Sequence, residues 1–230
     1  MKKYNITFTL VGEVPDLHKP EPSSKHVPEW YKNTISYADG KKIPDGNGIP
    51  KPTIKRCVPV FDAITSGYII KTYCDIFISK KNGSPYFEWS MGDAINFHPI
   101  DQAMNHPLKN GLDYPKIMNI WGIKTDPGVS CLFTSPFHRD SPFNILPGIV
   151  DTDTYTAPIN FPFVLKDTNF EGIIPAGTPV VQILPFPRGS WQMKIGNTVD
   201  FNEQLVVSKN LFSKFFDRYK SLYWHKKEYR

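Results

Sequence analysis

The chain has 230 residues, 22 prolines, an aromatic content of 14% and a net charge of +5. Its length allows one large domain or two small ones, and its prolines and aromatics favour strands joined by turns over a helical bundle. Three widely spaced cysteines without a CxxC pair exclude a disulfide framework and a zinc ribbon, and they indicate reduced thiols.

The N-terminal segment 1–14 is predicted to hold a strand, because residues 4–11 alternate polar and apolar side chains. Neither an apolar leader nor a run of membrane-spanning length is present, so we expect a soluble protein of the cytoplasm, or of the virion if the protein is viral. Residues 15–52 form a proline-rich arm with a single helical turn at 27–32. The arm either lies on the surface or recognises a partner.

Residues 53–200 are predicted to form the β core. Strands are expected at 57–61 and 68–78, and Lys80-Lys81-Asn82-Gly83 predicts a hairpin turn into a return strand at 86–91. Residues 92–116 read as a loop. Further strands are expected at 116–124, 129–134, 149–151, 159–165, 180–184 and 192–195. The predicted fold is a single antiparallel β-barrel or sandwich, dUTPase-like or jelly-roll-like.

Residues 201–230 are predicted to form a C-terminal amphipathic, basic helix. Apolar side chains recur at three- and four-residue spacing at Leu211, Phe212, Phe215, Phe216, Tyr219, Leu222 and Tyr223. Basic residues in 208–230 outnumber acidic ones by the whole net charge of +5, so nucleic-acid binding by the body is not favoured. The helix would pack on the barrel or a neighbouring subunit, or serve as a membrane-surface or nucleic-acid-binding tail.

Histidines and acids offer only weak metal sites. His138 and Asp140 match two ligands of a facial iron triad, but no histidine follows before His225, so a surface ion pair is favoured. His98, Asp101 and His106 fit neither HExxH nor a Cys/His zinc module. Phosphate-binding P-loop, dinucleotide-binding GxGxxG and hydrolase GxSxG motifs are all absent, and Ser135 and Ser141 suggest a dyad with His138 by proximity alone.

Three pieces in the second half of the chain follow one another in a familiar order: Pro127–Leu132 (PGVSCL), Pro147–Asp151 (PGIVD) followed by Tyr155, and Ala176–Ile183 (AGTPVVQI). Their order and spacing resemble the dUTPase and dCTP-deaminase-like family over about 60 residues. The resemblance implies a β architecture related to that family, with a nucleotide pocket beside these motifs.

By this resemblance, Asp151 would orient sugar or water as the candidate catalytic residue, and Tyr155 would lie over the deoxyribose. Gln182 would contact base or phosphate, Arg139 would serve the phosphates, and Gly148 and Gly177 would belong to the ligand-binding residues. Three features depart from the family: an extra residue precedes Tyr155, SPFHRDS replaces an Arg-Ser-Ser motif, and the C-terminal glycine-rich phosphate motif is missing. Turn formation and buried hydrogen bonding are the alternative roles for Gly148, Asp151, Gly177 and Gln182.

Two classes of function stay open. The first is a non-catalytic protein that binds a ligand, with a nucleotide as the candidate ligand. Its catalytic alternative is a nucleotide pyrophosphatase or a deaminase-like enzyme. The second is a structural or assembly protein of viral or phage type. No cofactor is predicted, and Mg²⁺ is expected to bind only together with a nucleotide. A homo-oligomer held by the C-terminal helix or the N-terminal arm is expected in either class.

Overall fold

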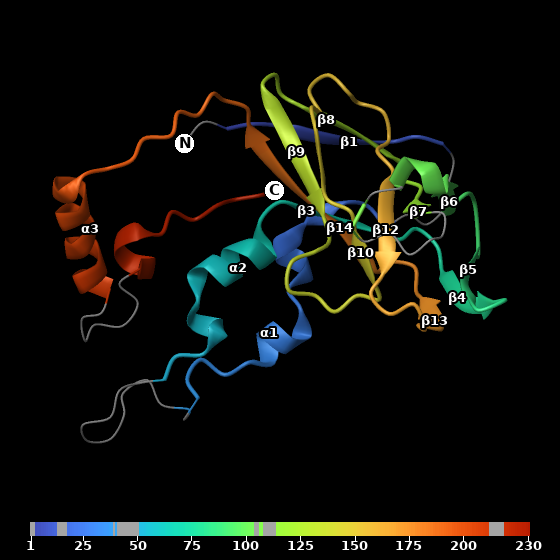
Figure 1. Cartoon of the computed structure of the whole chain (residues 1–230), viewed down its shortest axis with the longest axis horizontal. Helices are drawn as coiled ribbons and strands as arrows, with labels where there is room; N and C mark the ends of the chain where they lie inside the picture. Colours follow the sequence, from blue (N-terminus) through green and yellow to red (C-terminus); the bar gives the residue numbers. More distant parts are fainter. Residues whose placement is uncertain are drawn as a thin grey trace. The chain divides into compact units, whose positions relative to one another are not determined.

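The computed structural model is mainly β, with several antiparallel sheets (Figure 1). It describes residues 3–12, 18–38, 40, 51–103, 106–107, 114–211 and 219–230. The chain divides into two compact units. The first comprises Met1–Pro28, Ile64–Arg188 and Tyr229–Arg230, and the second comprises Glu29–Ala63 and Gly189–Glu228.

The first unit contains all of the described strands and two short 3₁₀ helices. The strands are β1 (Ile6–Leu10), β2 (Glu21–Pro22), β3 (Tyr68–Lys71), β4 (Ile76–Lys81), β5 (Ser84–Trp89), β6 (Ile95–His98), β7 (Tyr114–Ile117), β8 (Trp121–Thr125), β9 (Val129–Thr134), β10 (Phe143–Ile145), β11 (Gly148–Val150), β12 (Phe161–Leu165), β13 (Gly172–Ile174) and β14 (Pro179–Pro187). The 3₁₀ helices are η1 (Ser23–His26) and η3 (Ile100–Ala103).

The strands form four sheets, all with antiparallel pairing. Their strand orders are β1-β8, β10-β12-β7-β6, β11-β9-β14-β3-β2 and β13-β4-β5. No closed barrel forms among the described strands, so the barrel alternative of the sequence prediction is wrong. A barrel needs every edge strand to pair, whereas β11 and β2 end the five-stranded sheet without a second neighbour.

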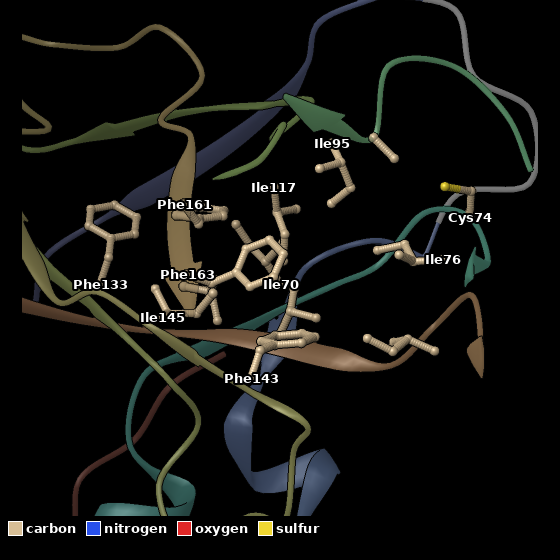
Figure 2. Close-up of a cluster of buried hydrophobic side chains, with 14 of the residues drawn as sticks. Ile70, Cys74, Ile76, Ile95, Ile117, Phe133, Phe143, Ile145, Phe161 and Phe163 are labelled. Carbon is tan, nitrogen blue, oxygen red and sulfur yellow. The ribbon is translucent and has the colours of Figure 1, made fainter. Parts of the chain in front are cut away.

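Phenylalanine rings from three strands hold the core of this unit together. Figure 2 shows Phe143, Phe161 and Phe163 beside one another, and the rings of Phe143 and Phe163 lie 5.1 Å apart. Phe133 of β9 stacks on Phe161 at 5.8 Å. Because these side chains are almost fully buried, each contributes both area removed from water and ring contacts.

The alternating patterns located several strands correctly. Residues 4–11 contain β1, 129–134 coincide with β9, and 180–184 lie inside the longer β14. Asn82 and Gly83 have φ values of 54° and 79°, as a tight turn between β4 and β5 requires.

Four strand predictions need correction. Residues 58–61 of the expected strand 57–61 belong to a helix, since Pro59 lies in its first turn, where the ring is tolerated. The expected strand 68–78 is split into β3 and β4 at Thr72, whose hydroxyl donates to Pro175 O. The 116–124 strand is split at Asn119, whose amide binds Trp121 N and O. The predicted loop 92–116 contains β6, and no strand occurs at 192–195.

The second unit is helical in its described part. Its elements are α1 (Glu29–Asn33), η2 (Ile54–Arg56), most of α2 (Val58–Thr65), α3 (Thr198–Leu211) and the π-helical turn η4 (Tyr219–Tyr223). α1 supplies the helical turn predicted at 27–32, and its Tyr31 is buried against Phe61. Asp62 of α2 accepts a hydrogen bond from Trp224 Nε1 at 2.9 Å and pairs with Lys227.

The predicted tail helix 201–230 is present only in part. α3 covers its start, η4 is a single turn, and residues 224–230 are not helical. Phe212, Phe215 and Phe216, which define the predicted aromatic face, lie outside the described residues. Trp224 and Lys227 instead bind the carboxylate of Asp62. The spacing of apolar residues along a helix cannot predict this contact.

Candidate functional site

The predicted site residues fall at two different ends of strand β9. Val150 pairs with Cys131, so Asp151 follows at the Ser130 end of β9, whereas Gln182 of β14 pairs with Thr134. Four residues of strand separate these levels, which corresponds to about 13 Å. The residues therefore form two clusters, which we name the Asp151 cluster and the Arg139 cluster.

The Asp151 cluster consists of Gly128, Ser130, Asp151, Asp153 and Arg188. Arg188 forms a bidentate ion pair with Asp153, in which Arg188 Nη1 lies 2.7 Å from Asp153 Oδ1. Arg188 Nη1 also lies 3.2 Å from Asp151 Oδ1 and donates to Ser130 Oγ. Ser130 Oγ donates to Asp151 Oδ1 at 2.6 Å. A bidentate guanidinium–carboxylate pair of this kind fixes the chain where β14 ends.

Asp153 is the more tightly held of the two carboxylates. The hydrogen bond from Arg188, reinforced by the backbone N–H of Gly128, lowers the pKa of Asp153 to about 2. The same pairing raises the pKa of Arg188. The Asp153–Arg188 pair spans 35 residues of sequence, so only the register of β9 with β11 and β14 reveals it.

We expect Asp153→Asn to lower stability at neutral pH and to change nothing at very low pH. The pKa of Asp153 is lower in the folded protein, about 2, than in the unfolded chain, about 4. Its carboxylate therefore stabilises the fold at pH values above about 4, and this contribution is lost as the pH falls toward about 2. Urea unfolding of both proteins between pH 2 and pH 7 measures this. Glu171→Gln, at an exposed position, should follow the wild-type curve. A stability difference that persists unchanged at pH 2 would contradict the assignment.

Tyr155 and Gly148 accompany Asp151 without sharing its ion pairs. Tyr155 N donates to Asp151 O at 2.9 Å, and its ring is half exposed. Gly148 pairs with Phe133, and a Cβ placed on it would meet nothing within 4 Å. Gly148 is therefore not required for a close approach. Gly177 differs, because its φ is +82° and an added Cβ would lie 2.8 Å from His18.

Gln182 is fully buried, and both ends of its amide bind backbone groups. Its Oε1 accepts from Phe137 N at 2.9 Å, and its Nε2 donates to Ser66 O at 2.7 Å. Gln182 thus ties the 135–142 loop to the turn before β3, which agrees with the buried hydrogen-bonding role considered from the sequence. The loop held in this way carries Arg139.

Arg139 has an unusual environment. Its Nε and Nη2 atoms are both buried, and neither has a hydrogen-bond partner. Burial lowers the pKa of Arg139. These two nitrogens carry the N–H groups of one flat edge of the guanidinium, the edge that binds both oxygens of a carboxylate or phosphate side-on.

Arg139 lies within electrostatic reach of His26, which belongs to a group of side chains around Glu21. Glu21 accepts from Lys71 at 2.7 Å, from His26 at 3.0 Å and from Lys25 at 3.3 Å. The bond from Lys71 is the largest cause that lowers the pKa of Glu21 to about 2. Burial lowers the pKa of His26, with Lys71 and Arg139 acting in the same direction. We give the name Arg139 cluster to Glu21, Lys25, His26, Lys71 and Arg139, which is linked to the others through its electrostatic interaction with His26.

The weaker metal candidates gain no support. His138 and Asp140 are both exposed, and His138 has a φ of 55°. Within the part of the chain that the structure describes, no group of three or more His, Cys, Asp or Glu side chains could hold a metal ion. The three cysteines are free thiols: Cys74 and Cys131 are buried and Cys57 is exposed.

Comparison with known proteins identifies no family. No protein-family model matches the chain, and no curated protein matches its sequence. Among the described residues, no helix is long and apolar enough to cross a membrane.

Proposed function

We propose that this protein is a non-catalytic binding protein for an anionic small molecule, with the Nε–Nη2 edge of Arg139 as the anchor for an oxyanion. The observation that carries the proposal is the burial of both nitrogens without a hydrogen-bond partner. A buried donor that lacks an acceptor costs about 1–3 kcal/mol, and more when it is charged. A bound carboxylate or phosphate removes that cost by accepting both N–H groups.

The surrounding side chains favour an anion over a neutral ligand. Within the Arg139 cluster, Lys25, Lys71 and Arg139 stand against one carboxylate, Glu21. Gln182 supports the site by holding the loop that carries Arg139. Side chains locked by packing and by second hydrogen bonds bind with less loss of conformational freedom.

A nucleotide is the ligand class that we propose. The resemblance to the dUTPase and dCTP-deaminase-like family supports it, and Arg139 is the residue to which that resemblance assigns the phosphates. A di- or triphosphate would bring its own Mg²⁺, because Mg²⁺ is commonly bound through substrate phosphates. We favour a jelly-roll-like or dUTPase-like arrangement of the sheets as the framework of this site.

The positions of the acidic residues support binding without catalysis. Asp151, the candidate general base, lies at the opposite end of β9 from Gln182 and contacts Arg188 and Ser130 through Oδ1. A general base must lie within hydrogen-bond reach of the proton that it removes. Gln182, which holds the loop that carries Arg139, is separated from Asp151 by roughly the length of four strand residues.

Thermal unfolding with a ligand panel tests this function. Pyrophosphate, dUTP, dCTP and ATP, each with and without Mg²⁺, should raise the Tm of the wild type. At a ligand concentration of 100 times Kd, the gain of about 2.7 kcal/mol corresponds to roughly 5–10 °C. Arg139→Met should abolish the shift yet melt at or above the wild-type temperature without ligand, because it removes a buried, unpaired cation.

Two further variants make the test specific. Arg139→Lys keeps the charge without the two-donor edge and should lose most of the shift, whereas Lys124→Gln changes an exposed cation and should keep it. Equal ligand shifts in wild type and Arg139→Met would refute the assignment of Arg139. A wild type that no anion stabilises would refute the function.

An assembly role is the second candidate function. The observation that favours it is an extended apolar segment after β14, which is exposed along its whole length.

A further inference from the structure

A segment between β14 and α3 displays large apolar side chains that the described structure leaves uncovered. We name residues 189–197 the apolar segment. Trp191, Met193 and Ile195 are 95%, 86% and 91% exposed, and they alternate with Gln192 and Lys194. Alternation of apolar and polar residues is typical of a strand with one buried face. The segment has this pattern but pairs with no described strand.

Three side chains of this size present an apolar area on the order of 500 Å². A surface of that extent is at the upper end of what a monomeric protein exposes without using it. The segment therefore requires an occupant that covers a short run of side chains spaced two residues apart.

A second uncovered apolar surface lies on the three-stranded sheet β13-β4-β5. Ile173 pairs with Phe77, and Tyr86 lies on the same face through its pairing with Ser79. These three side chains are 59%, 37% and 39% exposed, whereas Ile76 and Ile78, on the opposite face, are buried in the core. We name Phe77, Tyr86 and Ile173 the outer sheet face.

We infer that the apolar segment of one copy covers the outer sheet face of a second copy, and that the exchange is reciprocal about a two-fold axis. Both surfaces repeat every second residue along a strand, so their side chains can interdigitate.

The area supports a dimer. One segment and the partly exposed face that it covers contribute about 800 Å² together, and reciprocal exchange doubles this to about 1,600 Å². Stable interfaces bury about 1,200–2,000 Å². A two-fold interface also pairs each surface with its counterpart and leaves no open end for growth into filaments.

Analytical ultracentrifugation of the full chain tests the inference. The wild type should form a dimer. The segment variant, with Trp191, Met193 and Ile195 all changed to Ser, should weaken the dimer on the order of 100-fold or more, because buried tryptophans dominate interface energies. These side chains are exposed in the single chain, so the variant should fold with an unchanged circular dichroism spectrum. Gln192→Ser, on the polar side of the segment, is the matched control and should remain dimeric.

A mixing experiment distinguishes reciprocal exchange from any other dimer. A face variant, Phe77→Ser with Ile173→Ser, should also be monomeric alone. Mixed with the segment variant at high concentration, it should form heterodimers that are weaker than the wild-type dimer, since only one intact segment then meets one intact face. A monomeric wild type, a dimeric segment variant or a mixture that stays monomeric would each overturn the inference.

Discussion

Gly67→Ala should lower the free energy of unfolding by about 4 kcal/mol or more, which is a large part of the 5–15 kcal/mol of a typical domain. Gly67 has a φ of +73°, and a Cβ there would lie 1.9 Å from Ile183 O. A side chain at this position suffers a left-handed backbone, worth about 1–3 kcal/mol, and a backbone collision of similar cost. Urea unfolding followed by circular dichroism measures the loss.

Gly83→Ala is the matched control for Gly67→Ala. Gly83 has a φ of +79°, but an added Cβ would meet nothing within 4 Å. Only the conformational cost of about 1 kcal/mol should appear. If both variants lose the same stability, the close approach of the Gly67 turn to β14 is not what requires glycine.

The collision at Gly67 has structural consequences because this turn joins two parts of the first unit. Gly67 O accepts a hydrogen bond from Ser23 N at 2.9 Å, and Ser66 O accepts from Gln182 at 2.7 Å. A displaced turn would therefore loosen η1 and the amide link to the loop that carries Arg139. We expect Gly67→Ala to weaken anion binding together with stability.

Gln182→Leu should cost about 2–5 kcal/mol, although leucine is close to glutamine in size. The change leaves Phe137 N–H and Ser66 C=O without their partner. Each orphaned buried group costs about 1–3 kcal/mol. Gln192→Leu, at an exposed position of the apolar segment, should change stability by less than about 0.5 kcal/mol.

Ligand titration of Gln182→Leu separates two roles for this residue. If Gln182 acts by fixing the 135–142 loop, the variant should bind the anion more weakly below its melting temperature, while Arg139→Met should not bind at all. A variant that loses no stability would contradict the buried double hydrogen bond. An anion affinity equal to that of the wild type would show that the loop needs no such link.

Local patterns predicted the strands well where a single chemical signal dominated. Asn82-Gly83 marks the β4–β5 turn, because both residues accept positive φ. Residues 57–61 were assigned to a strand because apolar β-branched residues favour one, whereas Pro59 at the start of α2 and burial of Ile64 select a helix over 58–65. The split of 68–78 depends on Thr72 bonding to Pro175, a partner 103 residues away.

The candidate site was harder to predict than the fold. Asp151, Tyr155 and Gln182 were grouped by a resemblance in sequence order, but β9 places Asp151 and Gln182 at different ends. Arg188 was missed as the partner of Asp153, because a charge at the end of a strand gives no signal until the register is known. Arg139 was singled out as a phosphate ligand, but its unpaired buried edge is visible only in three dimensions.

Nuclear magnetic resonance of the arginine Nε–H groups can observe the proposed contact itself. In protein labelled with ¹⁵N-arginine, Arg139→Lys identifies the Arg139 signal by its disappearance. Titration with pyrophosphate or dUTP should move that signal downfield in a saturable manner, because its N–H gains a charged acceptor. An Arg139 signal that stays in place while saturating ligand moves other arginines, or moves none, would contradict an oxyanion site at this edge.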